Sequence, residues 1–267
     1  ALFSLLKNFY GSDLVITQYA GKPGGRFSFG SKLFARMLTK KDGLIGFHDA
    51  SRWNRMLYDQ LLLVRPEGAV AEHDRAALRV AGVPVSLSFP TLRYVEDRGA
   101  LSKFNLETGK FIVAHLFAGN AARGLHPDKK RELLVALAKK LPDTCLVIAG
   151  GASDREEALR AAESLPVMVV AGEATLQEMM NIIAHSRMVV SIDTGMAHIA
   201  AQLGKPLVVM RTCVGRAWWL PGQYAPDAPI TVFSHDSVCE NGHIGQAYPA
   251  CMDAISIGKV AEKASTL

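Results

Sequence analysis

A polar turn from Asp193 to Gly195 carries the residue types that bind a phosphate group. It follows the apolar run 188–190 and precedes a helical stretch at 196–203, so it lies where a buried strand ends and a helix begins. The free N–H groups and the positive dipole at such a helix start favour an anion. Thr194 adds a hydroxyl donor, and Gly195 lets the backbone approach a ligand closely. The turn therefore predicts a phosphate-binding site.

Strands and helices alternate from about residue 110 onward, which places this turn at one edge of a sheet. Strands are expected at 111–116, 144–149, 167–171, 187–192 and 206–210, and helices at 128–141, 154–164, 175–185 and 196–203. This alternation predicts a parallel sheet covered on both faces. Ligands bind such sheets at the carboxyl ends of the strands, which is where the turn lies.

The first part of the chain also has an α/β pattern. Strands are expected at 13–17 and 43–47, helices at 28–38, 53–64 and 72–81, and a linker at 89–106. We therefore expect two α/β domains, residues 1–107 and residues 108–267.

Composition narrows the class of protein. A hydrophobic fraction of 49% in 267 residues supports a substantial core, and no apolar run is long enough to span a membrane. The four cysteines lack C-x-x-C spacing and the histidines lack metal-ligand spacing, so we expect reduced thiols and no metal site.

Charge is unevenly distributed along the chain. Residues 1–110 carry 16 Lys and Arg against 10 Asp and Glu, whereas the remainder is nearly balanced. This excess is either ordinary surface charge or a sign of an anionic partner for the first domain. The absence of a dense basic run with interleaved aromatic residues argues against nucleic acid.

Several segments together resemble glycosyltransferase family 9, the ADP-heptose:lipopolysaccharide heptosyltransferases. The strongest is Asp193-Thr194-Gly195-Met196-Ala197-His198, which is similar to the family's diphosphate turn. The resemblance extends from about Phe111 to Val260 and is thinner before that. The supporting segments are 111–115, 118–123, 146–151, 172–176 and 250–255.

The resemblance implies a GT-B fold, in which two Rossmann-like domains face a cleft. It also implies a donor site in the second domain. Its expected contacts are Asp193, Thr194, Gly195, Met196, Ala197 and His198 around the diphosphate, Gly119 and Asn120 in the first loop, Glu156 at the ribose, and Glu173 and Ala174 at the adenine. Arg123 is expected to stabilise charge on the leaving diphosphate.

Some of these residues have structural interpretations as well. Asp193 is also suited to capping the helix after it, and His198 to bracing the turn. Asp154 and Glu157 compete with Glu156 for the ribose, and a solvated helix start is an equal alternative for all three.

The implied reaction moves a heptose from ADP-heptose to a lipopolysaccharide core, with inversion and without a metal or other cofactor. The implied setting is a bacterial cytoplasm, at the inner membrane surface. Gln18, Lys22 and Arg26 follow an expected strand in the basic half of the chain and are candidate contacts to an anionic acceptor. The final helix is expected to pack on the first domain.

One departure from the family limits this interpretation. Nothing matches the family's first strand and Gly-Asp turn, which carries the presumed general base, so the first domain is expected to be incomplete and the base stays unassigned. A nucleotide-sugar-binding module without transfer activity is the alternative. An NAD-dependent oxidoreductase is disfavoured because no G-x-G-x-x-G follows a predicted strand. Architecture alone does not exclude a nucleotide-sugar epimerase.

Overall fold

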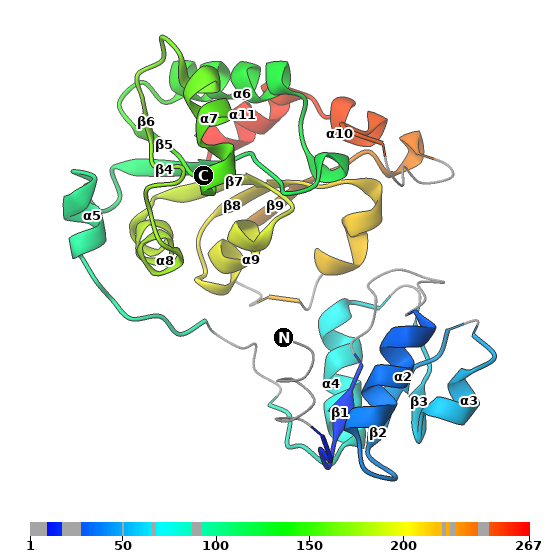
Figure 1. Ribbon diagram of the computed structural model, residues 1–267. Helices are drawn as coiled ribbons and strands as arrows, with labels where there is room; N and C mark the ends of the chain where they lie inside the picture. Colours follow the sequence, from blue (N-terminus) through cyan, green and yellow to red (C-terminus); the bar gives the residue numbers. More distant parts are fainter. Residues whose placement is uncertain are drawn as a thin grey trace. The chain divides into compact units, whose positions relative to one another are not determined.

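The computed structural model describes residues 10–17, 28–49, 51–65, 68–86, 92–220, 223–224, 228–239 and 246–267. The chain forms two compact units, which are residues 1–89 with 217–223, and residues 90–216 with 224–267 (Figure 1). The sequence placed the division after residue 107. Gln18, Lys22 and Arg26, expected to contact the acceptor, lie outside the described residues.

The first unit contains a small parallel sheet with the strand order β1-β2-β3. Its elements are β1 (Val15–Ile16), α2 (Phe29–Leu38), β2 (Leu44–Phe47), α3 (Asn54–Leu57), β3 (Gln60–Leu62) and α4 (Val70–Val80). Alternate residues of β2 face opposite sides, as a pleated strand requires. Ile45 and Phe47 pack with α4, whereas Leu44 packs with Ala35 of α2.

The prediction of a helix at 53–64 is wrong, because only the first turn of this segment is helical and β3 follows it. The Asp59 carboxylate accepts the N–H of Leu44 at 2.8 Å, which draws the chain alongside β2. Tyr58 packs on Gly46, where an added Cβ would lie 2.2 Å from the ring. These contacts with β2 outweigh the local helical preference.

Residues 217–223 leave the second unit and complete the first. Ala217 joins the core beneath α4, and the Gln223 side-chain oxygen accepts the N–H of Ala71 at 3.0 Å, at the start of that helix. This excursion follows β8 and precedes β9 in the chain, so the first unit is built from two separate segments.

The second unit is a six-stranded parallel sheet with the order β6-β5-β4-β7-β8-β9. Its strands are β4 (Phe111–His115), β5 (Cys145–Ile148), β6 (Val167–Val169), β7 (Met188–Ile192), β8 (Leu207–Met210) and β9 (Ile230–Phe233). The order runs outward in both directions from the β4–β7 pair. That is the doubly wound arrangement of dinucleotide-binding folds.

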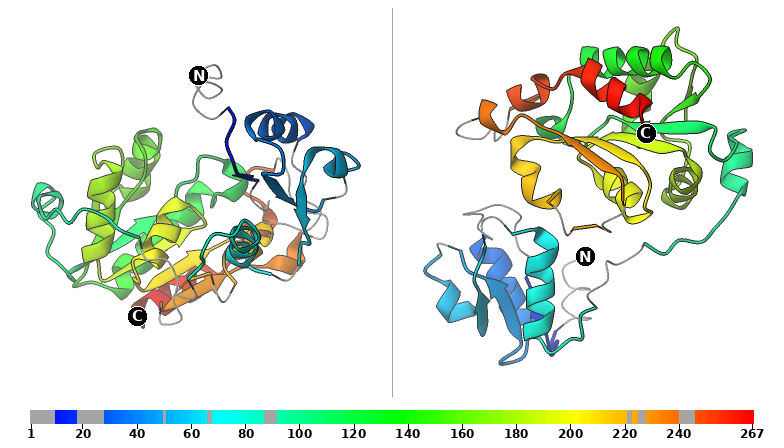
Figure 2. Two further views of the ribbon diagram at one scale, coloured as in Figure 1. Left: turned by 90° about the horizontal axis from the view of Figure 1, so that it is seen from below. Right: turned by 180° about the vertical axis from the view of Figure 1, so that it is seen from behind.

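Helices cover both faces of this sheet, as expected. In Figures 1 and 2, α6 (Pro127–Lys140), α7 (Arg155–Ala162) and α11 (Ile257–Ser265) lie on one face, and α8 (Leu176–His185) and α9 (Gly195–Gln202) lie on the other. The shorter elements are α5 (Gly99–Lys103), α10 (Ala250–Asp253) and the 3-10 turns η1 (Ala121–Arg123), η2 (Ala152–Asp154), η3 (Cys213–Trp218) and η4 (Asp236–Val238).

Two features of the second unit differ from the expectation. Strand β9 was not predicted, and α5 lies inside the expected linker and packs against α8. The final helix lies within the expected second domain, where Ile257, Val260 and Ala264 are buried in the core and α11 packs on α6. Its expected packing on the first domain stays a prediction. In the part of the chain that the structure describes, no helix combines the length and apolarity that a bilayer span needs.

Candidate functional site

The candidate site lies at the carboxyl ends of β4 and β7, where the strand order of the large sheet reverses. Thr194, which follows β7, places its Oγ1 3.2 Å from Nδ1 of His115 at the end of β4. The Ser191 hydroxyl donates to the His115 carbonyl at 3.1 Å. Burial lowers the pKa of His115 to about 4, so its imidazole is neutral near pH 7. This reversal point is where doubly wound sheets bind ligands.

The start of α9 offers backbone donors at this point. Thr194 is the N-cap residue in extended conformation, and its side chain makes no capping hydrogen bond. The N–H groups of Ala197 and His198 both donate to the Thr194 carbonyl. Within the described residues, the N–H groups of Gly195 and Met196 have no acceptor. Two adjacent donors at the positive end of a helix suit a phosphate oxygen.

Gly195 leaves open space at this helix start. A Cβ added there would meet no protein atom within 4 Å. Packing against the described residues therefore does not require a glycine here, and the open space suits the approach of a ligand.

The Asp193 side chain lies between α9 and η3 and is only 12% exposed. Its Oδ1 lies 3.3 Å from His198 Nε2, and its Oδ2 would be 2.6 Å from a Cβ added to Gly215. The Tyr224 hydroxyl hydrogen-bonds His198 Nδ1, and the two rings stack at 6.0 Å. Burial and the charge of Asp193 raise the pKa of Tyr224, so the neutral hydroxyl can donate to His198. The arrangement fits the bracing role that the sequence suggested.

The loop after β4 brings Asn120 and Arg123 to the same edge of the sheet. The Asn120 side chain accepts the N–H of Ala122 at 2.9 Å and so caps η1. The exposed Arg123 guanidinium makes no ion pair with the part of the chain that the structure describes. Gly119 is exposed, with no atom within 4 Å of an added Cβ. The loop thus presents a cation that has no ion-pair partner among the described residues.

The acidic residues proposed for the ribose each have a partner within the protein. Glu156 is 84% exposed and pairs with Arg160 one turn along α7. Glu157 pairs with Lys130 at 2.7 Å. Asp154 accepts the N–H of Gly151 at 2.8 Å.

Glu173 and Ala174 follow β6 and lie beside α7 and α5. The Glu173 carboxylate pairs with Arg155 at 2.5 Å, and its carbonyl accepts from Lys103 at 2.7 Å. Gly172 before them has a φ of +75°, which turns the chain away from the strand. The adenine assignment for these two residues stays a prediction.

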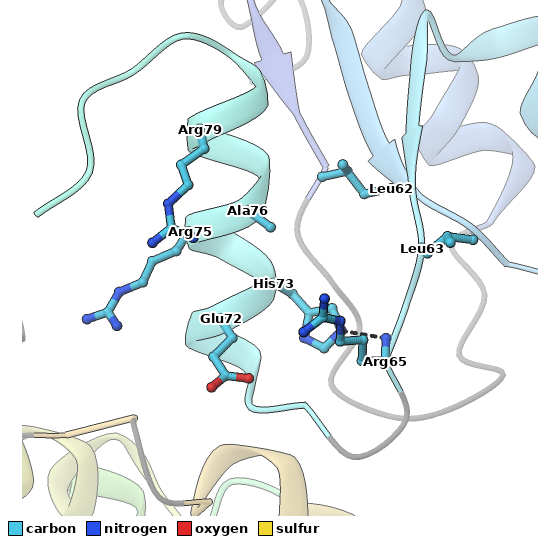
Figure 3. A pocket seen from close by; sticks show the side chains of 8 residues that line it. All are labelled: Leu62, Leu63, Arg65, Glu72, His73, Arg75, Ala76 and Arg79. Carbon is cyan, nitrogen blue, oxygen red and sulfur yellow. Dashed lines mark hydrogen bonds between the residues drawn. The ribbon is translucent and has the colours of Figure 1, made fainter. Parts of the chain in front are cut away.

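A basic pocket in the first unit was not predicted from the sequence. It has a volume of about 490 Å³ and is lined by residues of α4 and by the end of β3 with the loop after it. Figure 3 shows Arg75 and Arg79 projecting from α4, with Arg65 on the loop. The backbone N–H of Arg65 donates to Nε2 of the buried His73 at 3.0 Å, which fixes this loop to the helix. The only feature of the sequence that pointed toward this pocket was the excess of basic residues in the first 110 residues.

Comparison with known proteins identifies the family. The sequence profile of glycosyltransferase family 9 (heptosyltransferase) matches residues 28–210, more than half of the chain. No curated protein sequence matches.

Solved structures match over nearly the whole chain. Escherichia coli ADP-heptose LPS heptosyltransferase II is 20% identical, with a TM-score of 0.64 over 99% of this chain and 78% of that one. A family 9 glycosyltransferase from Veillonella parvula is 17% identical, with a TM-score of 0.70 over 99% and 77%. E. coli heptosyltransferase WaaC with ADP is 16% identical, with a TM-score of 0.65 over 99% and 76%.

At these identities the structural likeness shows the fold, and it confirms the GT-B class of two Rossmann-like units. The profile match extends from the start of α2 in the first unit to the end of β8 in the second. The chain belongs to glycosyltransferase family 9, the heptosyltransferase family, and is a glycosyltransferase.

Proposed function

We propose that this glycosyltransferase transfers a heptose from ADP-heptose to a sugar of a lipopolysaccharide core, with inversion at the anomeric carbon. The observation that carries the proposal is the pair of backbone donors, Gly195 and Met196, at the β4–β7 reversal point. They supply what a diphosphate needs in a family whose relative WaaC was solved with ADP.

The donor diphosphate binds at the start of α9. Thr194 and the N–H groups of Gly195 and Met196 donate to phosphate oxygens, with Ala197 and His198 behind them. Asp193 orders the turn through His198 and does not face the phosphate, since two negative groups would repel. Gly119 and Asn120 line the neighbouring loop, while Glu156, Glu173 and Ala174 are assigned to the nucleoside.

The reaction is a direct displacement. An acceptor hydroxyl oxygen bonds to the anomeric carbon as the bond from that carbon to the diphosphate oxygen breaks, and the hydroxyl proton passes to a general base. No described residue is assigned as that base. Arg123 and the helix start stabilise the charge that develops on the departing ADP, so no metal is invoked at the diphosphate.

The acceptor binds the first unit through the basic pocket of Arg65, Arg75 and Arg79. The acceptor that we propose is anionic, and arginine binds carboxylate and phosphate groups well. The setting that we propose is the cytoplasmic face of a bacterial inner membrane, contacted through charge.

The test combines binding and turnover. ADP is titrated calorimetrically against the parent, Gly195→Ala and the control Gly258→Ala, whose added Cβ also meets no atom within 4 Å. We expect loss of ADP affinity only in Gly195→Ala, because its methyl group occupies space kept for phosphate. Equal affinity in all three proteins would place the diphosphate elsewhere.

Transfer is then assayed with ADP-heptose and a core acceptor. Formation of heptosylated acceptor supports the proposal. ADP binding with no transfer from any nucleotide sugar would favour the alternative, a nucleotide-sugar-binding module.

A further inference from the structure

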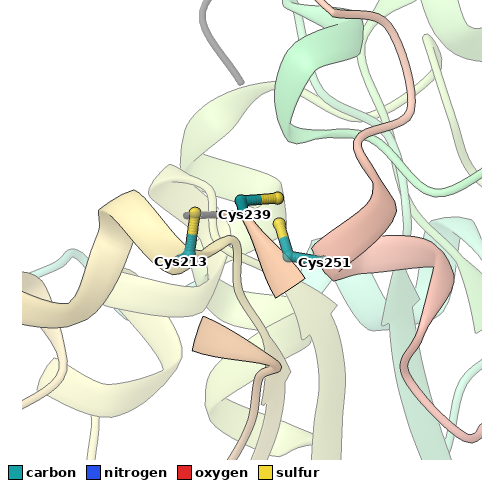
Figure 4. A group of neighbouring side chains, drawn as sticks. All are labelled: Cys213, Cys239 and Cys251. Carbon is teal, nitrogen blue, oxygen red and sulfur yellow. The ribbon is translucent and has the colours of Figure 1, made fainter. Parts of the chain in front are cut away.

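Three cysteines from separate segments converge in the second unit (Figure 4). Cys213 lies in η3 after β8, Cys239 follows η4 after β9, and Cys251 lies in α10. Their sulfur atoms all lie within 4.8 Å of one another. Four thiolates or imidazoles around zinc, at about 2.3 Å for sulfur, place sulfur atoms about 3.8 Å apart. The cluster is therefore close to the spacing of a metal site.

The scaffold around the cluster is well fixed. Cys251 is fully buried in the core, and Cys213 and Cys239 are half-buried. Arg211 is only 6% exposed. Its guanidinium donates to both carboxylate oxygens of Asp236, at 2.8 and 2.9 Å, and to the Thr212 carbonyl. This ties the segment that carries Cys213 to the segment that carries Cys239.

The geometry points to a zinc site, and we propose that the Sγ atoms of Cys213, Cys239 and Cys251 bind one Zn²⁺ with water as fourth ligand. Soft thiolate ligands select zinc over the hard cations that bind phosphates. Binding forms three S–Zn bonds and releases the three thiol protons to solvent, and no electron is transferred. In the part of the chain that the structure describes, no other His, Cys, Asp or Glu joins the group.

The three proposed zinc ligands are not among the residues assigned to the donor. They lie in η3, after η4 and in α10, whereas the diphosphate is assigned to the loops after β4 and β7. The sequence pointed away from a metal because the three cysteines are far apart in the chain and none forms a C-x-x-C pair.

The test measures metal content and ligand type. The reduced chain is purified, dialysed against zinc and then against metal-free buffer, and analysed by inductively coupled plasma mass spectrometry. We expect about one zinc per chain in the parent. Cys145→Ser is the matched control, because Cys145 is an exposed thiol at the start of β5 and outside the cluster. Cys145→Ser should keep its zinc. The zinc content of Cys239→Ser should be at least about tenfold lower than that of the parent.

Cobalt substitution of the parent protein keeps the test independent of variant folding. Co²⁺ bound by three thiolates gives an intense sulfur-to-cobalt charge-transfer band and the visible bands of a tetrahedral ion. Absence of stoichiometric zinc together with absence of that band would overturn the proposal. A parent mass lower by two hydrogen atoms, mapped to a disulfide within the cluster under the same reducing conditions, would overturn it too.

Discussion

The Nε2 atom of His198 lies 3.3 Å from Oδ1 of Asp193, so the acidic residue of the phosphate turn is turned toward its own helix. Tyr224 occupies the other ring nitrogen of His198, which fixes the imidazole between two partners. A carboxylate held in this way shapes the turn that carries the N–H groups of Gly195 and Met196.

Asp193→Asn tests this arrangement. The amide has nearly the same shape but lacks the charge that orients His198, so we expect ADP affinity to fall about tenfold. Isothermal titration of ADP measures it. If Asp193 instead faced the phosphate, removing its negative charge would relieve repulsion, and tighter binding by the variant would contradict the bracing role.

Gly215→Ala addresses the same carboxylate from its other side. The new Cβ would lie 2.6 Å from Asp193 Oδ2, so the side chain of Asp193 must rotate away from His198. We expect ADP affinity to fall by a factor similar to that of Asp193→Asn, with a loss of about 1 kcal/mol in unfolding free energy. Gly258→Ala is the control, since it adds the same methyl group in open space. Unchanged ADP affinity in Gly215→Ala would show that the position of the Asp193 side chain does not affect ADP binding.

The large sheet and its phosphate turn could be predicted because their signals are local. Buried parallel strands are continuous apolar runs, and the residues at 193–195 and at 204–206 mark the ends of α9. Strand β9 was not predicted because it is a short, half-buried edge strand and lacks the continuous apolar run of the central strands. Strand β3 was misassigned because its apolar residues continue the helical pattern of α3.

The parts of the site that the sequence could not predict depend on contacts between distant residues. Tyr224 meets His198 only because the chain returns from its excursion into the first unit at that point. The pocket of Arg65 and Arg79 joins a loop to a helix, and the two residues share no motif. Spacing rules search within one segment, so they do not detect residues that meet through the fold.

The stability of the second unit should depend on pH through His115. Its pKa is lowered from 6.5 to about 4 by burial, so the unfolded chain binds the proton more tightly than the folded one. The corresponding stability is present above pH 6.5 and is lost as the pH falls toward 4, by about 3 kcal/mol in total. Denaturant unfolding of the parent and His115→Gln between pH 7 and 4 measures it. A parallel decline in both proteins would exclude His115 as the cause.

Arg123→Ala should reduce turnover far more than it reduces nucleoside binding. The guanidinium is assigned to charge that appears on the diphosphate only as the sugar departs, so kcat is expected to fall by about 10²–10³-fold. Adenosine affinity should be unchanged because adenosine carries no phosphate. Arg160→Ala, which removes an exposed arginine that pairs with Glu156 on α7, is the control. An unaltered kcat in Arg123→Ala would remove this residue from the mechanism.

The basic pocket of the first unit makes a prediction that separates acceptor from donor. Arg79→Ala should raise the KM for an anionic core acceptor about three- to tenfold, because it removes one of the positive charges that line the pocket. The affinity for ADP should not change, since the donor residues belong to the other unit. The effect should shrink as ionic strength rises, because exposed charges are screened.

Arg55→Ala is the matched control for this experiment. Arg55 is an exposed arginine on α3 of the same unit and does not line the pocket, so its removal lowers the net charge equally. A KM effect in Arg79→Ala and none in Arg55→Ala assigns acceptor binding to the pocket, because general attraction would respond to both changes. Equal effects of the two substitutions would mean that a broad basic surface, and not the pocket itself, attracts the acceptor. No effect of either would place the acceptor elsewhere on the protein.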